Sequence, residues 1–394
     1  MSWGVPMTKP STKLPPAWHF EQGPIRPPSE AHSLLLRVSR NCPWNRCTFC
    51  PVYKGSTFSL RSVEDVCRDV DAVAQHLDLL RRKLDEVDCD TQGVLQFLHD
   101  RLPPAQQAPF RAAAHWLTGG LQSVFLQDAD GLVIGPAKLT AILAHLQATF
   151  PWQFRITAYT RSPTVLRFAD EELTALRRAG LRRLHIGLES GCDAVLEKVH
   201  KGATRAMHIQ AGQRVRQAGI ELSEYVMPGL GGRALSERHA RDSATALNAI
   251  RPDFIRLRTL AIPEGIPLYE EWRRGEFEPC SSVEIARELL LFLQTLDGIT
   301  GELASDHVLN LFEDLTGTLP DDQPRLVAMV QSFLDLPAKR RCLYLVGRRG
   351  GLLRGLQDLN DPAREAAAQD LCRQLGATVD NVEDICRSLM QRFI

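Results

Sequence analysis

The sequence predicts an α/β protein built on a partial (β/α)6 barrel of parallel strands. From residue 34 onward, short apolar runs alternate with longer segments of helical periodicity, which is the pattern of β-α units in a parallel sheet. Capping residues and glycines stand where these helices should begin and end. The 394 residues suffice for one large domain with additions. We expect a Pro-rich N-terminal arm over residues 1–30, the barrel over 31–280 and a helical C-terminal region over 281–394.

The N-terminal arm is rich in proline and has little periodicity. Proline removes a backbone donor and disrupts both helices and central strands, so this segment should be extended and packed against the core. Its prolines are Pro6, Pro10, Pro15, Pro16, Pro24, Pro27 and Pro28.

Six segments have the length and composition of buried strands, and helical patterns follow most of them. The expected strands are Leu34–Ser39, Ser123–Gln127, Phe154–Tyr159, Arg183–Leu188, Leu222–Met227 and Phe254–Leu260. The expected helices are Val63–Val87, Pro136–Phe150, Asp170–Ala179, Arg205–Ala218 and Ser236–Ile250.

The ends of these helices carry the residues that favour them. Ser62 precedes the first helix, and Glu64 and Asp65 in its opening turn suit the positive end of the helix dipole. Gly180 and Gly219 follow two other helices, where a residue with positive φ commonly ends the last turn.

Two regions depart from the β-α pattern. Residues 88–119 are too long for an ordinary connection, so we expect a helical insertion that serves as a lid or a partner surface, with a helical patch near 112–117. After residue 280 the alternation stops, and amphipathic helices are expected instead. These are Val283–Leu296, Val308–Leu315, Leu326–Leu336 and Ala363–Leu375.

The composition narrows the function classes. The 47 basic and 47 acidic residues cancel, which gives no reason to expect nonspecific attraction to nucleic acid or a membrane. No leader-like N-terminus and no long apolar run is present, so a soluble, cytoplasmic protein is expected. Ten cysteines are too sparse for a disulfide scaffold, and their one tight cluster suits metal binding in a reducing compartment.

That cluster is Cys42, Cys47 and Cys50, in one loop after the first expected strand. A 4Fe-4S cluster is commonly held by four thiolates, so three would leave one iron open to an outside ligand. The alternative is a structural zinc site, which usually needs a fourth protein ligand and often shows two Cys-x-x-Cys pairs. No second such pair occurs in the chain.

Further motifs accompany this loop in a fixed order. They are Gly187–Gly191 (GLESG), Lys201–Thr204 (KGAT), Tyr225–Gly232 (YVMPGLGG) and Asp253–Leu260 (DFIRLRTL). Together with the strand and the three-cysteine loop, they make residues 30–270 resemble the radical S-adenosylmethionine (SAM) superfamily, and most closely its elongator and anaerobic coproporphyrinogen oxidase-like branch. One departure is that four residues, not the usual three, separate Cys42 from Cys47.

The resemblance implies a radical SAM enzyme. Its three cysteines would hold a 4Fe-4S cluster, and SAM on the open iron would be cleaved reductively to a 5'-deoxyadenosyl radical that acts on an unidentified substrate. It also implies a reductant such as flavodoxin or ferredoxin as a partner. A non-catalytic Fe-S redox or sensor module and a zinc-stabilised interaction protein are the alternatives.

Three residues match positions that contact SAM in the family. Phe49 corresponds to the aromatic residue near the adenine, and its alternative is ordinary loop packing. Asp128 corresponds to the polar group that binds the methionine amino group, with Asp130 as its rival because turn aspartates also bond their own backbone. Glu189 corresponds to the acidic residue near the ribose hydroxyls.

Two arginines of the sixth strand, Arg256 and Arg258, share one face and should point into the barrel. Anionic partners for them are the SAM carboxylate, an acidic group of the substrate, or protein carboxylates in a structural salt bridge. Other polar side chains on inward faces also suggest a substrate cavity. They are Arg155, Thr157 and Tyr159 of the third strand and Tyr225 of the fifth.

Two histidines and one basic stretch are further candidates. His185 and His307 could carry protons or be structural. The arginines between Arg340 and Arg354 could meet phosphate backbones, but a solvated helix edge is the favoured interpretation, so nucleic acid is not an expected partner.

Overall fold

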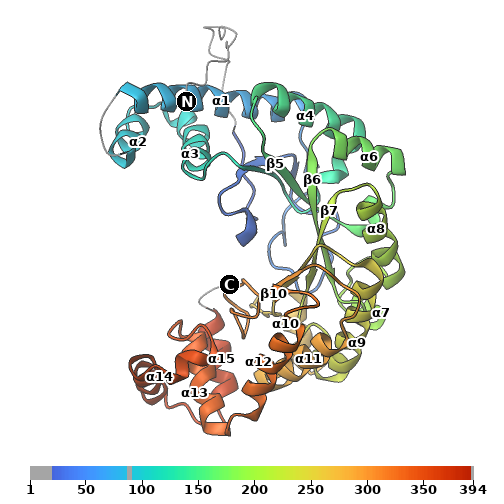
Figure 1. The fold of residues 1–394 in the computed structure, drawn as a ribbon, viewed down its shortest axis with the longest axis vertical. Coiled ribbons are helices and arrows are strands. Elements are labelled where there is room, and N and C mark those ends of the chain that lie inside the picture. The colour runs from blue at the N-terminus through green and yellow to red at the C-terminus, as the bar shows by residue number, and fades with distance from the viewer. Residues whose placement is uncertain (1–19, 87–90, 392–394) are drawn as a thin grey trace.

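The computed structural model describes residues 20–86 and 91–391 and is centred on one mainly parallel sheet. Its strand order is β1-β4-β5-β6-β7-β8-β9-β10, and all neighbours are parallel except β9 and β10. β1 and β10 are the two edges, so the sheet is an open arc, and the predicted α/β class is confirmed (Figure 1). The strands are β1 (Leu34–Arg37), β4 (Ser123–Gln127), β5 (Arg155–Thr160), β6 (Leu181–Glu189), β7 (Glu221–Val226), β8 (Phe254–Leu257), β9 (Glu302–Ala304) and β10 (Gly317–Thr318). A separate antiparallel pair joins β2 (Ser39–Arg40) to β3 (Ser59–Leu60).

The six predicted strands correspond to β1, β4, β5, β6, β7 and β8. β8 ends at Leu257, three residues before the predicted end at Leu260. The sheet also continues beyond residue 280, because Glu302 to Ala304 of β9 pair in parallel with β8. A strand of three residues is too short for its alternation to be recognised in the sequence.

Helices cover the outer face of the arc, as Figure 1 shows for α1, α4, α6 and α8. The sheet residues facing them are apolar, and Ile156, Leu184 and Ile186 are fully buried in one core with residues of these helices. These helices and their neighbours are α1 (Val63–Glu86), α4 (Pro136–Thr149), α5 (Ser162–Val165), α6 (Asp170–Arg178), α7 (Asp193–Lys198), α8 (Arg205–Gln217), α9 (Gly232–Ile250) and α10 (Pro267–Arg273). Three short 3-10 turns, η1 (Pro28–Glu30), η2 (Gly131–Ile134) and η3 (Leu356–Asn360), complete the connections.

The expected helix ends are present. The Ser62 hydroxyl accepts the Asp65 N–H at 3.0 Å at the start of α1. Gly180 and Gly219 follow α6 and α8 with φ of 110° and 73°, a conformation that glycine adopts without strain.

The insertion forms two helices, α2 (Thr91–His99) and α3 (Pro104–Thr118). α3 packs along α1, and Phe110 and Trp116 are buried in the same core as β1 and β4. The lid or partner surface predicted for the insertion therefore does not describe α3, which is an integral part of the core.

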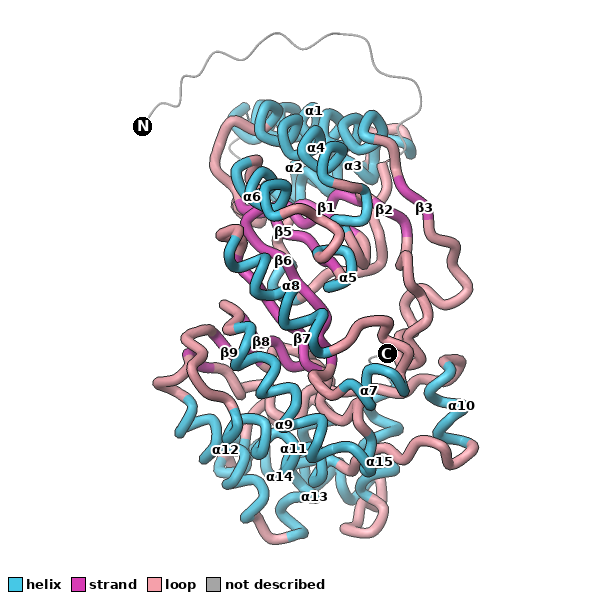
Figure 2. Tube along the Cα trace, turned by 90° about the vertical axis from the view of Figure 1, so that its right-hand side faces the viewer, coloured by secondary structure: helices cyan, strands magenta, loops and turns pink. Residues whose placement is uncertain are grey.

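The C-terminal helices gather at the other end of the molecule (Figure 2). They are α11 (Ser282–Thr295), α12 (Gln323–Asp335), α13 (Ala338–Arg349), α14 (Pro362–Gln374) and α15 (Val382–Met390). They share a second core with Val226 and Ile255 of the sheet. None of the helices within the described residues is both long and apolar enough to cross a lipid bilayer.

Two predictions in this region were wrong, the second only in part. The helix expected over 308–315 is a series of turns, and its apolar pattern arises because Leu309, Leu311, Phe312 and Leu315 are buried in the core. The solvated edge predicted for the basic stretch fails for Arg348 and Arg349, which are each only 4% exposed, but holds for Arg340, whose side chain is 43% exposed, and for Arg354.

The N-terminal arm is extended and packed against the core where the structure describes it, from Phe20 onward; most of its prolines lie outside the described residues. Its backbone passes Gln127 at the end of β4, whose side-chain amide accepts from the Gly23 N–H at 2.8 Å and donates to the Gly23 and Ile25 carbonyls at 3.1 and 2.5 Å. Glu30, which is fully buried, ends the arm. Burial acts to raise the pKa of Glu30, but donation from His185 and Ser33 outweighs it and lowers that pKa.

Candidate functional site

The cysteine loop follows β1 and β2, at the carboxyl end of the first sheet strand, where barrel folds place their reactive groups. Cys42, Cys47 and Cys50 are half-buried free thiols. The loop is tightly folded, since the Cys50 N–H donates to the Cys47 carbonyl at 3.4 Å and the Asn45 N–H donates to Cys42 Sγ at 3.3 Å. Among the described residues, no three His, Cys, Asp or Glu side chains converge as a single metal ion would require.

Positive charge lies beside these thiols. Burial raises the pKa of both Cys47 and Cys50. Lys201 and Arg161 act in the opposite direction on Cys47, because their charges favour its thiolate. Metal binding would therefore have to displace thiol protons, and the two cations would assist it.

Trp44, one of the residues between Cys42 and Cys47, anchors the loop to the segment that follows α7. Its indole N–H donates to the His200 carbonyl at 2.7 Å. The guanidinium groups of Arg46 and Arg161 each lie 5.0 Å from the centre of its ring. A Cβ on Gly202 would lie 2.3 Å from the ring, so only glycine permits this contact. Trp44, one of the four residues that separate Cys42 from Cys47, thus holds the loop in place.

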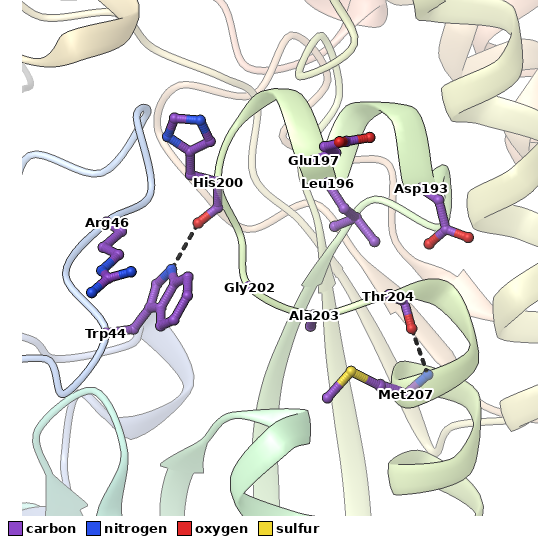
Figure 3. A pocket seen from close by; sticks show the side chains of 10 residues that line it. All are labelled: Trp44, Arg46, Asp193, Leu196, Glu197, His200, Gly202, Ala203, Thr204 and Met207. Carbon is purple, nitrogen blue, oxygen red and sulfur yellow. Dashed lines mark hydrogen bonds between the residues drawn. The ribbon is translucent and has the colours of Figure 1, made fainter.

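An open groove of about 610 Å³ lies between Trp44 and the residues of α7 and the segment after it. Figure 3 shows Trp44 and Arg46 on one wall, facing the α7 residues Glu197 and Asp193 across Gly202. The groove has charges of both signs, so its charge favours no class of ligand.

The two rival aspartates after β4 have different surroundings. Asp130 is fully buried and accepts from the Thr160 hydroxyl at 2.9 Å and the Thr164 hydroxyl at 2.6 Å, so both of its oxygens are in use. Burial raises the pKa of Asp130 to about 6. Asp130 therefore joins the end of β4 to Thr160 of β5 and Thr164 of α5, and each of its oxygens already accepts a hydrogen bond.

Asp128 keeps one oxygen free. Its Oδ2 accepts from the Arg37 guanidinium at 2.7 Å and from the Asn41 N–H at 3.0 Å, next to the first cysteine. Its Oδ1 is buried and has no hydrogen-bond partner among the described residues. A buried carboxylate oxygen without a donor is costly, so this atom is suited to an amino group that the protein itself does not supply.

The N-terminal arm and Tyr53 cover Asp128. A Cβ on Gly23 would lie 1.9 Å from Asp128 Oδ1, so the backbone of the arm passes directly over this atom. The Tyr53 hydroxyl is buried nearby, and its pKa is raised first by burial and then by the charge of Asp128. The arm therefore covers Oδ1 on the side where Gly23 lies. Nothing in the sequence pattern pointed to Gly23 or Tyr53 as parts of this site.

Glu189 ends β6 in a left-handed conformation with φ of 61°. Its Oε1 accepts from Lys201 Nζ at 3.1 Å, and its charge acts to raise the pKa of Cys47 and Cys50. The structure therefore brings Glu189 and Lys201 to the cysteine loop. Lys201 was visible in the sequence as part of the KGAT motif, but its role there was not.

Phe49 is 7% exposed and belongs to an apolar cluster with Cys192, Met227 and Leu260. Cys47 and Cys50 pack against the same cluster. Phe49 therefore packs the loop onto the ends of the strands.

The two arginines of the sixth strand differ. Arg256 is 6% exposed and pairs with Asp306 at 2.8 Å, which is the structural alternative considered above. Arg258 makes no ion pair among the described residues, its Nε is buried without a partner, and its guanidinium lies 5.6 Å from the centre of the Tyr225 ring. Arg258 is thus the one that remains available to an anionic group.

Aromatic rings line the inner face of the arc beside these arginines. The ring centres of Tyr159 and Tyr225 are 5.8 Å apart, and His185 lies 5.4 and 5.9 Å from them. Burial lowers the pKa of His185. His307 is bonded locally, since its Nδ1 accepts the Leu309 N–H at 3.3 Å, and burial lowers its pKa to about 4. Both histidines are therefore neutral at pH 7.

Comparison with known proteins finds a similar family. The sequence profile of the Radical SAM superfamily matches residues 109–242, a segment that contains Asp128 and Glu189 and begins after the cysteine loop. This segment of the chain is similar to the radical SAM superfamily. Members of this superfamily use a 4Fe-4S cluster and SAM, and the predicted resemblance is confirmed.

Two curated relatives are similar to part of this chain. The tRNA uridine(34) acetyltransferases of Methanocaldococcus infernus and Methanocaldococcus jannaschii are each 26% identical to it, over 129 and 128 residues. The match covers 32% of this chain and 24% of each relative, so the chain spans about a quarter of their length. The solved structure of Escherichia coli coproporphyrinogen III oxidase, described as a radical SAM enzyme, shares 15% identity over 66% of this chain and 52% of its own, with a TM-score of 0.42.

Proposed function

We propose that this protein is a radical SAM enzyme that holds a 4Fe-4S cluster on Cys42, Cys47 and Cys50. The cluster, reduced by a donor such as flavodoxin or ferredoxin, would cleave bound SAM to a 5'-deoxyadenosyl radical that acts on a substrate not yet identified. The shared segment is about a quarter of the curated relatives' length, so their tRNA substrate is not carried over.

The observation that carries this proposal is that polar residues at the ends of the neighbouring strands lie beside the loop with the three free thiols. Asn41, next to Cys42, contacts Asp128, and Glu189 and Lys201 approach Cys47. In a cluster each thiolate binds a different iron, so the thiols need not converge on one point as the ligands of a zinc ion must. The lack of a convergent single-metal site among the described residues is therefore consistent with a cluster on these thiols.

The chain's own residues have separate roles in this proposal. Lys201 and Arg161 favour the thiolate form of Cys47. The free Oδ1 of Asp128 would accept from the amino group of SAM, while Arg37 and the Asn41 N–H hold the other oxygen in place. Glu189 would accept from the ribose hydroxyls.

The inner face of the arc would hold the substrate. The ring centres of Tyr159 and Tyr225 lie 5.8 Å apart, and the Arg258 guanidinium lies 5.6 Å from the centre of the Tyr225 ring, so the three side chains form one group. Arg258 would bind an acidic group of the substrate or the carboxylate of SAM, since Arg256 is already paired with Asp306.

Anaerobic reconstitution with iron and sulfide tests the proposal. We expect about four iron and four sulfide per chain, and 5'-deoxyadenosine after dithionite and SAM are added. Replacing Cys42, Cys47 and Cys50 by alanine should abolish both, whereas Cys67→Ala, a half-buried cysteine of α1, should change neither.

Three results would contradict the proposal. A reconstituted cluster that cycles between redox states without binding or cleaving SAM would make the protein a redox or sensor module. Stoichiometric zinc with no iron after anaerobic purification would favour the interaction protein. Full cleavage activity in the triple alanine variant would show that other residues hold the cluster.

A further inference from the structure

A small cavity of about 100 Å³ lies where the strand ends meet the C-terminal helices and shares no lining residue with the groove of Figure 3. The connections after β7 and β8 form one side, through Gly229 and Thr259, and helices α13 and α15 form the other, through Arg349 and Glu383. None of these residues entered the proposed radical chemistry. The cavity thus lies between the sheet and the C-terminal helices, the region that was predicted least accurately from the sequence.

Arg349 is the buried charge of this cavity. It is 4% exposed, its Nη1 donates to the Leu309 carbonyl at 2.6 Å, and its Nε is buried with no partner. The part of the chain that the structure describes offers it no carboxylate within ion-pair distance. Its neighbour Arg348 differs, because Arg348 pairs with Glu313 at 3.3 Å. Burial lowers the pKa of Arg349 to about 10, so the group is still charged at pH 7.

Of the other ionisable groups in the wall, Glu383 favours the charged form of Arg349 but forms no ion pair with it among the described residues. Both oxygens of Glu383 accept from Ser282, one from its N–H at 2.9 Å and one from its hydroxyl at 3.0 Å. Arg387 pairs with Asp384 and lies over the Trp272 ring. Burial raises the pKa of both wall thiols, Cys280 and Cys386, to about 12, so they carry no negative charge.

A buried guanidinium without a carboxylate is costly to the fold, and its remaining N–H donors match the paired oxygens of a carboxylate or phosphate. A purely structural tether to Leu309 would use only one of those donors. We propose that this cavity binds the anionic group, carboxylate or phosphate, of a small molecule, and that Arg349 is the residue that binds it. The inference does not depend on the iron-sulfur cluster.

Binding of inorganic phosphate and of acetate to the full chain tests this site. Each probe is titrated calorimetrically at constant ionic strength, with chloride as the balancing ion, into protein with and without reconstituted iron. We expect saturable binding of at least one probe, and the tighter of the two identifies the preferred class. Arg349→Met should weaken it at least about tenfold, which is the loss of a charge-assisted bond.

Two variants separate a ligand site from a structural tether. Arg340→Met removes an arginine of the same helix that is 43% exposed and pairs with Glu365, so phosphate and acetate should bind as to the wild type. Glu383→Gln removes the negative charge from the wall and should tighten anion binding about threefold or more, which a tether to Leu309 would not do. This variant also keeps the test decisive if Arg349→Met fails to fold.

The proposal is overturned if neither probe saturates on the wild type, or if Glu383→Gln leaves the affinity unchanged. Equal binding by wild type and Arg349→Met would show that the anion binds elsewhere. None of these outcomes bears on SAM cleavage, so failure here leaves the radical SAM proposal standing, and failure of that proposal leaves this one.

Discussion

Asp128 and Asp130 show what sequence can and cannot decide for single residues. Both follow β4, and each is the residue type that binds an amino group, so the motif could not separate them. The difference comes from Thr160 and Thr164, which are distant in sequence and occupy both oxygens of Asp130. The cysteines, in contrast, were recognisable because all three lie within nine residues of one another and their chemistry depends on that local spacing.

The roles of the two aspartates give the first prediction. Asp128→Asn should weaken SAM binding to the reconstituted protein about 10- to 100-fold, because a charge-assisted hydrogen bond to the amino group becomes a neutral one. Asp130→Asn is the matched control and should change the affinity less than about threefold. Anaerobic calorimetry with SAM measures both. A larger loss in Asp130→Asn than in Asp128→Asn would reverse the assignment.

The burial of Asp130 also predicts how stability depends on pH. Its pKa rises from 3.8 to about 6 on folding, so the folded state binds the proton more tightly than the unfolded state. Well below pH 3.8 both states are protonated, and as the pH rises through 6 the folded state must carry a buried charge. The stability of the wild type relative to Asp130→Asn should therefore fall by about 2 kcal/mol between pH 4 and pH 7. Urea unfolding of the iron-free proteins measures it, and a rise with pH would contradict the assignment.

Among the elements, the N-terminal arm was recognised as extended from its prolines, but its path was not. Its position depends on hydrogen bonds between its backbone at Gly23 and Ile25 and the side chain of Gln127, which lies about 100 residues further along the chain. Helices with clear caps, such as α1 after Ser62, were predicted closely because their signals are local. β9 was not predicted, because its structure depends on pairing with β8 and not on a local signal.

The Gln127 contacts give a prediction about the arm. Gln127→Leu keeps the volume of the side chain but removes three hydrogen bonds, so the amides of residues 21–26 should exchange with solvent at least about tenfold faster. Because Gly23 covers Asp128, a loosened arm should also tighten SAM binding.

Hydrogen exchange with mass spectrometry measures the first effect and calorimetry the second. Gln22→Leu is the control, because Gln22 is exposed on the same arm and should alter neither quantity. Unchanged exchange in Gln127→Leu would show that other contacts hold the arm. Weaker SAM binding would mean that the arm forms part of the binding site.

At the scale of the whole molecule, two apolar cores lie along one sheet. The first packs α1, α3, α4 and α6 on the N-terminal half, and the second packs the C-terminal helices on Val226 and Ile255. The sequence predicted the first half well, because long helices and strands alternate there. The second half was harder to predict, because the turns after β9 are apolar and buried, and the α13 arginines Arg348 and Arg349 are also buried. Polar residues are usually exposed, but long-range packing decides the burial of these arginines.

Phe312 tests whether the C-terminal helices and the sheet unfold together. It is 1% exposed, lies in a segment of turns, and packs against Phe333 and Tyr344 with ring centres 5.4 and 6.2 Å away. Phe312→Ala should destabilise the protein by about 3–5 kcal/mol, the usual cost of emptying such a site. Because the same core contains Ile255 and Leu303, amide exchange should accelerate in β8 and β9 as well as in α12 and α13. Val308→Ala, at a position in the same turns that is 42% exposed, should cost less than about 0.5 kcal/mol. If Phe312→Ala accelerated exchange only beyond residue 304, the helices would be a separate folding unit docked on the edge of the sheet.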